Sequence, residues 1–332
     1  MSTVSTIDDA ATRGRRMGRM LTERPVIVLS AALLVLYVVT GIQDPSLFTA
    51  QGIRSTLLLA CPLAIMAAAQ TVCMLTGGID LSSAMIANFA AYISANNAGA
   101  GPLQSLGFAF LVGAVVGLIN GVGVGVFKVN PLIMTLGMSS VLVGVVTVGI
   151  VGDGFLSGSS RLLPFVKTVG SGNLFGPIPL NATVLLLVSV ALLYGLRRTG
   201  LGRNIYAVGD NEPAVRLAGS RVWQVLIAVY VIAGILAALA GLMFSGISGS
   251  VGPDQTNSYL LPAIAAAVIG GTSILGGTGG FAGTIVGALI LTVLNRLLLG
   301  FETSEAVRQI IYGIIVLALA WVYVRLTGQR AD

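Results

Sequence analysis

Side chains that could do covalent chemistry are scarce in this sequence of 332 residues. It contains no histidine, so histidine-based catalytic triads, zinc-peptidase motifs and haem ligation are excluded. Its two cysteines, Cys61 and Cys73, would lie about 18 Å apart along a helix and cannot form a disulfide bond with each other. The phosphate-binding patterns GxxxxGKS and GxxxxGKT are absent from the sequence, so the chain cannot hydrolyse ATP itself. We therefore expect a protein that is not an enzyme.

Asp80 is the only acidic residue at or near the interior of an apolar stretch. One interpretation is a contact with a substrate or a part in energy coupling. The other, which we favour, is an N-cap of a helix that begins at Leu81, because aspartate is a strong N-cap residue. Carboxylates inside membranes mark proton and ion relays, so a single ambiguous example argues against a proton-driven mechanism.

The elements that must hold these groups are apolar helices. Hydrophobic residues make up 55% of the chain and charged residues 9%, against about 25% charged in soluble domains, and the mean hydropathy is +0.96. At roughly 20 residues per membrane-spanning helix, the apolar runs predict an all-α polytopic membrane protein with spans at 26–43, 53–76, 79–97, 103–127, 131–151, 181–196, 222–246, 259–275, 281–299 and 307–324.

Basic residues orient these ten predicted spans. Thirteen lysines and arginines fall on the side of the N-terminus and five on the other side, which the positive-inside rule assigns to a cytoplasmic N-terminus. An even number of spans then makes both termini cytoplasmic. Topology thus explains the net charge of +6, and we expect no nucleic-acid partner. The domains are a basic arm at 1–25, favoured as an orientation signal over a lipid-binding segment, a transmembrane domain at 26–324 and a tail at 325–332.

Two connections between spans are long. The outer one, 152–180, is rich in glycine and proline and predicts a folded loop or a short interfacial helix. The inner one, 197–221, predicts a helix of about two turns, with Asn211 or Asp210 as its cap, Glu212 and Pro213 in its first turn and Gly219 at its end. Spacing alone favours an ordinary capped loop helix over one that transmits force.

Four segments carry a family resemblance: LTGGIDLSS (75–83), KVNPLIMTLGM (128–138), TGLGRNIYAVGDNEPAVRLAGSRV (199–222) and AAVIGGTSILGGTGGFAGTIVGALI (266–290). In this order they resemble the permeases of ABC importers for monosaccharides, and the similarity runs over roughly residues 25–325. The resemblance implies a bacterial inner-membrane subunit that pairs with a second copy or a sister permease. It also implies two further partners, an ATPase that binds ATP and Mg, and an extracytoplasmic sugar-binding protein. The coupling helix seated in the ATPase would contain Asp210, Asn211, Glu212, Pro213, Ala214, Arg216, Leu217 and Gly219.

The order of the spans predicts an inverted repeat. Spans 2–5 start outside and spans 7–10 start inside, as in inverted-repeat transporters, and the resemblance implies the type II importer fold. Glycines recur every fourth residue at Gly113, Gly117, Gly121 and Gly125, and again at Gly279, Gly283 and Gly287. Small residues at this spacing let helices approach closely in lipid, so we favour packing over a direct transport role.

Helical breaks are expected at Gly77–Gly78 and from Gly270 to Gly280, where free backbone groups must face protein or a wet cavity. Such hydrogen-bonding surfaces suit a sugar. We expect about a third of the nearby polar residues to line its path and the rest to be packing or capping contacts. These candidates are Thr76, Asp80, Ser82, Ser83, Asn88, Asn120, Thr135, Thr272, Ser273 and Asn295.

Charges on the outer side form a candidate docking rim for the binding protein. Opposite charges at a rim steer and register a reversible partner, although a solvated rim without a partner is as good an interpretation. The candidates are Arg296, Glu302, Glu305 and Arg308.

The sequence therefore favours the permease subunit of an ATP-driven importer for a monosaccharide or a similar small polyol. The first alternative is a secondary sugar transporter or facilitator that works without an ATPase. The second is a membrane enzyme acting on lipid-linked sugars, which would need a cluster of acids or a nucleophile and base at the interface.

Overall fold

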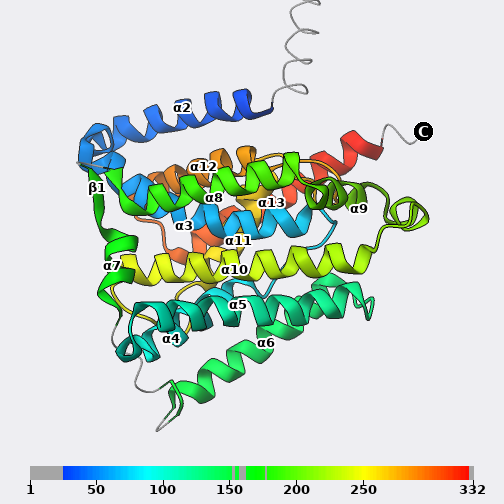
Figure 1. The fold of residues 1–332 in the computed structure, drawn as a ribbon. Coiled ribbons are helices and arrows are strands. Elements are labelled where there is room, and N and C mark those ends of the chain that lie inside the picture. Colours follow the sequence, from blue (N-terminus) through cyan, green and yellow to red (C-terminus); the bar gives the residue numbers. More distant parts are fainter. Residues whose placement is uncertain (1–24, 152–153, 157–161, 176–177, 329–332) are drawn as a thin grey trace, which may run out of the picture.

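The computed structural model describes residues 25–151, 154–156, 162–175 and 178–328, and this part of the chain is almost entirely helical (Figure 1). The basic arm predicted at 1–25 lies outside the described residues except for Pro25, and so does the end of the tail, 329–332. The elements are α2 (Pro25–Gln43), η1 (Pro45–Phe48), α3 (Ala50–Met74), α4 (Ser83–Asn96), η2 (Ala98–Ala100), α5 (Pro102–Gly125), α6 (Pro131–Ile150), α7 (Pro164–Ser171), β1 (Asn173–Phe175), β2 (Ile178–Pro179), α8 (Leu180–Arg198), α9 (Gly200–Leu217), α10 (Val222–Ser248), η3 (Asn257–Tyr259), α11 (Leu260–Ile269), α12 (Phe281–Gly300) and α13 (Glu305–Gly328).

The helices run in alternating directions between two ends of a bundle (Figure 1). We call the end that carries α9 the α9 end, and the opposite end, which carries α7 and the antiparallel pair β1 and β2, the α7 end. In the outer connection, the predicted short helix corresponds to α7. The last helix, α13, continues past the predicted boundary at residue 324 to Gly328.

Ten helices occupy the ten predicted spans, and among the described residues seven are long and apolar enough to cross a membrane. The predicted spans 79–97 and 259–275 were too long, because α4 has 14 residues and α11 has 10. Helices of these lengths rise only about 21 Å and 15 Å, less than the roughly 30 Å of a hydrocarbon core. The non-helical segments 75–82 and 270–280 adjoin them, so both predicted breaks are confirmed.

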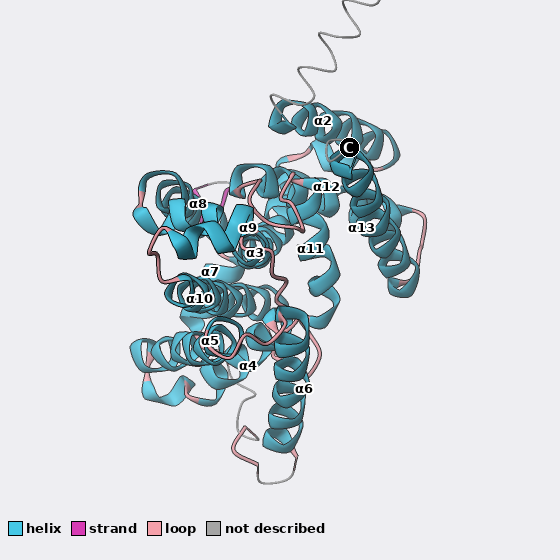
Figure 2. Ribbon diagram, turned by 90° about the vertical axis from the view of Figure 1, so that its right-hand side faces the viewer, coloured by secondary structure: helices cyan, strands magenta, loops and turns pink. Residues whose placement is uncertain are grey.

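The predicted repeat has two halves, α3 to α6 and α10 to α13, and helices of each half pack against the first helix of the other (Figure 2). The first long helix of each half, α3 and α10, lie against each other. Helices α4 and α5 of the first half pack on α10, while α11 and α12 of the second half pack on α3. Within the halves, α4 contacts α5 and α6, and α11 contacts α12 and α13 in the same way. Each of these contacts therefore has a counterpart in the other half, as the predicted inverted repeat requires.

Glycine seams hold two of these helix pairs together. A Cβ atom added at Gly117 would lie 2.3 Å from the carbonyl oxygen of Tyr230, and one at Gly113 would lie 2.5 Å from that of Gly234, so α5 meets α10 backbone to backbone. In the second half, a Cβ at Gly287 of α12 would lie 2.2 Å from the carbonyl oxygen of Ala266 in α11, and one at Gly283 would lie 1.8 Å from that of Gly270 just after α11. The contacts have the close approach that small residues permit in membranes, as the spacing predicted.

Candidate functional site

Helix α9 is divided by a kink at Asn211, whose φ and ψ are −155° and 88°. The Asn211 side chain accepts a hydrogen bond from the backbone N–H of Ala214 (3.0 Å), and Gly219 ends the segment with a φ of +83°. This second half of α9 is the short helix that the sequence predicted, with Asn211 as the cap and not Asp210. The first half, 200–210, was expected to be loop. The Thr199 hydroxyl caps it by accepting from the N–H of Gly202 (3.1 Å), a signal that the sequence offered.

The second half of α9 presents charged and apolar groups to the surroundings. Glu212 forms ion pairs with Arg216, one helical turn away, and with Lys128 at 3.3 Å. Leu217 is 90% exposed at the end of the same half-helix. This half of α9 thus leaves one large apolar side chain and a mixed charge cluster accessible at the surface.

The two non-helical segments meet beside α9. The backbone N–H of Gly277 donates a hydrogen bond to the carbonyl oxygen of Leu75 (3.0 Å), which joins segment 270–280 to segment 75–82. The Tyr206 hydroxyl, from the first half of α9, donates to the carbonyl oxygen of Gly279 (3.0 Å). Burial raises the pKa of Tyr206, with a smaller opposing effect from Arg197, so this hydroxyl keeps its proton for the bond.

Asp80 is buried in segment 75–82, with 1% of its surface exposed. Its Oδ1 atom accepts hydrogen bonds from the backbone N–H (2.9 Å) and the hydroxyl (2.6 Å) of Ser82. These bonds form a turn just before the helix and not an N-cap, because α4 begins at Ser83 with Ser82 in the N-cap position, so the predicted cap of a helix starting at Leu81 is wrong. The role of Asp80 in substrate contact stays a prediction.

A polar network extends from Asp80 to four helices. The Gln70 side chain of α3 donates to the carbonyl oxygen of Asp80 and to the hydroxyl of Ser83, both at 2.7 Å. Asn120 of α5 donates to the Ser82 hydroxyl (2.9 Å), and Thr135 of α6 accepts from the N–H of Leu81 (3.0 Å). The network therefore fixes the path of segment 75–82 between α3, α4, α5 and α6.

Sequence reasoning missed two residues at this network. Gln70 is the key donor, and an amide in an otherwise apolar span was a signal for it. Tyr230 of α10 is the second, because a Cβ atom added at Gly78 would lie 2.6 Å from its hydroxyl. Buried atoms without a hydrogen-bond partner among the described residues include Asp80 Oδ2, Asn120 Oδ1 and the Tyr230 hydroxyl.

The other candidate path residues lie apart from this network. Thr76 belongs to segment 75–82, and Thr272 and Ser273 belong to segment 270–280. Asn88 donates to the carbonyl oxygen of Pro253 near the α7 end. Asn295 accepts a hydrogen bond from Tyr312 (3.2 Å) and lines a cavity of about 80 Å³ that contains further polar groups. The additional polar residues of this cavity are Ser258, Tyr259, Thr292 and Glu305.

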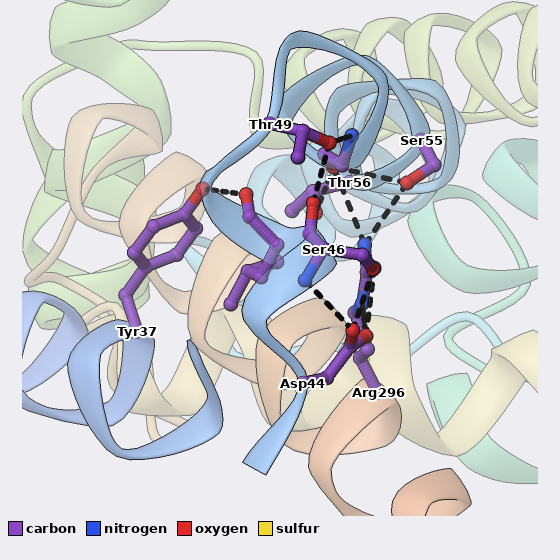
Figure 3. A network of polar contacts seen from close by, with 9 residues as sticks. Tyr37, Asp44, Ser46, Thr49, Ser55, Thr56 and Arg296 are labelled. Atoms are coloured by element: carbon purple, nitrogen blue, oxygen red, sulfur yellow. Dashed lines mark hydrogen bonds and ion pairs between the residues drawn. The ribbon is translucent and has the colours of Figure 1, made fainter. Parts of the chain in front are cut away.

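At the α7 end, Arg296 is bound inside the chain (Figure 3). Its guanidinium donates to Asp44 Oδ2 through Nε (3.0 Å) and Nη2 (2.8 Å), and Nη2 also donates to the Ser46 hydroxyl (2.9 Å). Nη1 donates to the carbonyl oxygen of Gly52 (3.3 Å) and to the Ser55 hydroxyl (3.0 Å). These five contacts use the full set of N–H groups of an arginine and tie α12 to η1 and α3.

The remaining rim candidates differ in exposure. Arg308 pairs with Glu305 and donates to the carbonyl oxygen of Thr303 (3.3 Å), so its side chain is largely covered. Glu302 and Glu305 are exposed. A second arginine at this end, Arg54, donates to Asn173 and to the carbonyl oxygen of Ser171, both at 2.7 Å, and holds α3 against α7 and β1. Among the described residues, no three Asp, Glu, Cys or His side chains come together as a metal site requires.

Comparisons with known proteins match most of the chain. The family model "Branched-chain amino acid transport system / permease component" matches residues 52–320. The chain is 36% identical over 288 residues to the ribose import permease protein of Escherichia coli K12, which covers 86% of this chain and 89% of that protein. It is 33% identical over 304 residues to the ribose import permease protein of Haemophilus influenzae, covering 91% and 93%.

A third relative is named for a different cargo. The chain is 35% identical over 292 residues to the autoinducer 2 import system permease protein of Yersinia pseudotuberculosis, covering 87% of this chain and 81% of that protein. A search of the solved structures finds no match. The matched regions include the two non-helical segments and α9.

Proposed function

The chain belongs to the branched-chain amino acid transport system / permease component family, and from this premise we propose that it is the permease subunit of an ATP-driven ABC importer for a monosaccharide or a similar small sugar or polyol. It is a multi-pass membrane protein whose relatives are import permeases. The observation that carries the cargo class is the identity of 33–36% to two ribose import permeases over nearly the whole chain.

The second half of α9 is the proposed docking site for a separate ATPase, which would bind ATP and Mg. Its exposed leucine and its charged residues stand at one end of the bundle, where a partner can reach them without entering lipid. This assignment makes the α9 end cytoplasmic, together with both termini, in the inner membrane of a bacterium. The positive-inside distribution supports the same orientation.

The α7 end is then extracytoplasmic and faces the proposed sugar-binding protein. Glu302 and Glu305 are exposed there and can steer that partner, with Arg308 beside them. Arg296 serves the fold at this end, because its donors are satisfied within the chain. A second copy of this chain or a sister permease would complete the translocation path, and the two partners would expose that path alternately.

The deciding experiment exchanges the charges of α9. Glu212→Arg combined with Arg216→Glu and Lys128→Glu keeps both ion pairs of position 212, so the half-helix survives while the charges shown to the ATPase are inverted. In liposomes that hold the chain with its ATPase and binding protein, we expect ATP-driven uptake of radiolabelled ribose, or of the sugar that the binding protein takes, to be lost. The amount of chain inserted should not change.

Glu302→Lys at the α7 end is the matched control, since it should leave co-purification of the ATPase unaltered. Full ATPase association with the exchanged charges would reject the docking site on α9. Uptake by the chain alone, with no ATPase in the liposomes, would reject the importer and favour a secondary transporter.

A further inference from the structure

Four glycines bring three distant segments into backbone contact at the α9 end. They are Gly77 of segment 75–82, Gly209 of α9, and Gly276 and Gly277 of segment 270–280, and we call them the glycine joint. A Cβ atom added at Gly209 would lie 1.9 Å from the carbonyl oxygen of Leu75 and 2.5 Å from the backbone nitrogen of Gly277. One added at Gly276 would lie 2.8 Å from the carbonyl oxygen of Gly209 and 3.0 Å from the nitrogen of Gly77. No side chain separates these backbones.

Close approach is the reason for glycine at position 209. Gly209 lies within a helix and needs no left-handed conformation, yet an alanine there would overlap two other segments. At Gly200, at the start of the same helix, only the far end of the Arg203 side chain comes within 4 Å of an added Cβ atom. Close approach to the two non-helical segments is therefore a property of Gly209, whereas Gly202 of the same helix approaches the carbonyl oxygens of Gly195 and Leu196 in α8.

Hydrogen bonds lock the same three segments together. Gly277 donates to Leu75, which links the two non-helical segments, and Tyr206 donates to Gly279, which links α9 to one of them. Segment 270–280 also borders a cavity of about 340 Å³, whose lining includes Tyr206, Thr278 and Phe281. The segment thus has a rigid contact with α9 and open space next to it.

We infer that the glycine joint makes α9 and both non-helical segments move as one unit, so that a displacement of α9 shifts segments 75–82 and 270–280 together. Backbones in van der Waals contact have little slack, because packed protein is nearly incompressible. Gly209 acts as a positioning residue: it holds the two segments against α9 and touches no cargo. The inference rests on the proposed function, in which the ATPase moves α9.

The test measures movement of segment 270–280 and needs no knowledge of the cargo. Leu275 is 65% exposed, whereas Cys61 and Cys73 are buried, so Leu275→Cys provides a single reactive thiol among the described residues. The chain with this change is assembled with its ATPase in lipid nanodiscs. Its rate of labelling by a maleimide is measured with and without ATP, and ATPase binding and ATP hydrolysis are measured on the same sample.

Gly209→Ala should reduce the ATP-dependent change in labelling rate by about fivefold or more, the lower end of usual coupling factors, while the ATPase still binds. Gly200→Ala should leave the change intact. Gly241→Ala is the control for packing alone. Gly241 belongs to α10, which is not part of the joint, and its added Cβ atom would lie 2.0 Å from the carbonyl oxygen of Ala87 in α4. This variant should lower thermal stability without reducing the ATP-dependent change.

If Gly209→Ala does not accumulate, Tyr206→Phe decides the question, since it removes the hydrogen bond from α9 to Gly279 and takes only the hydroxyl group out of the packing. A reduced ATP-dependent change in that variant supports the inference, and an unchanged one overturns it. Equal responses in Gly209→Ala and Gly200→Ala, or an equal loss in Gly241→Ala, would overturn the glycine joint while the proposed function stood. Failure of the unaltered chain to bind any ATPase would instead overturn the proposed function, and the joint with it.

Discussion

Each end of the bundle has a contact that joins distant segments, and the two contacts differ in kind. At the α7 end, the long side chains of Arg54 and Arg296 span the gaps between α3, α12 and the outer elements. At the α9 end, Gly209 and Gly276 remove side chains altogether and let the backbones touch. A side-chain clamp tolerates small shifts because its rotamers adjust, whereas a backbone contact does not.

This difference matches what each end must do under the proposed function. The α7 end would receive a binding protein that comes and goes, and a clamp whose side chains can adjust accommodates the small shifts of each encounter without coming apart. The α9 end would be displaced by an ATPase, and a contact without slack passes that displacement on. The following variants test the comparison, from the largest expected effect to the smallest.

Gly276→Ala should be the most damaging single change. Gly276 has a φ of +95°, which costs a residue with a side chain about 1–2 kcal/mol, and the overlap with Gly209 adds about 1–3 kcal/mol. Thermal unfolding in detergent measures the loss. Gly219→Ala is the matched control, because Gly219 has a φ of +83° and nothing within 4 Å of an added Cβ atom. Equal losses in both variants would mean that the backbone contact contributes nothing.

Arg296→Gln should have an intermediate effect, because it removes most of the donors that tie α12 to η1 and α3. We expect Tm to fall by roughly 2–4 °C. Affinity for the binding protein should change little, and Arg221→Gln, at the exposed start of α10, should leave Tm unaltered. Loss of binding-protein affinity with no change in Tm would make Arg296 a docking residue, as the sequence first suggested, and not a clamp.

The smallest effect concerns pH. Hydrogen bonds from Ser46 and then Arg296 lower the pKa of Asp44 in the folded chain. A lowered folded pKa stabilises the fold above the ordinary carboxyl value of about 3.9, and this contribution is lost as pH falls through the folded pKa. The difference in Tm between the unaltered chain and Asp44→Asn should therefore be constant from pH 6 to about pH 4 and shrink below. A constant difference at lower pH would show that the clamp does not depend on the Asp44 charge.

Local patterns predicted most of the fold. Apolar runs placed the helices, and the fourth-residue glycines of α5 identified the seam with α10 because small residues at that spacing serve close packing. A cap at Asp210 or Asn211 and the Gly219 terminus also followed from residue type and position, and the fold selects Asn211. The errors at 79–97 and 259–275 arose because apolar composition continues through segments whose backbone is not helical.

Contacts between distant residues were beyond such patterns. In the sequence, Arg296 is one of several charges near the outer ends of the apolar stretches. Only the fold reveals that Asp44 lies beside it. Gly209 belongs to no glycine repeat, so its contact with Leu75 could not be seen in the sequence. The docking residues, the path residues and the boundaries of the domains stay predictions.

The exchange of helices between the halves has a consequence for biosynthesis. Helix α5 presents its glycine face to α10, yet residues 126–221 must leave the ribosome before α10 begins. At ordinary elongation rates this takes about 5–20 s. During that interval the glycine face of α5 in an inserted first half has no partner helix. The translocon, a chaperone or lipid must shield this face from non-native pairing.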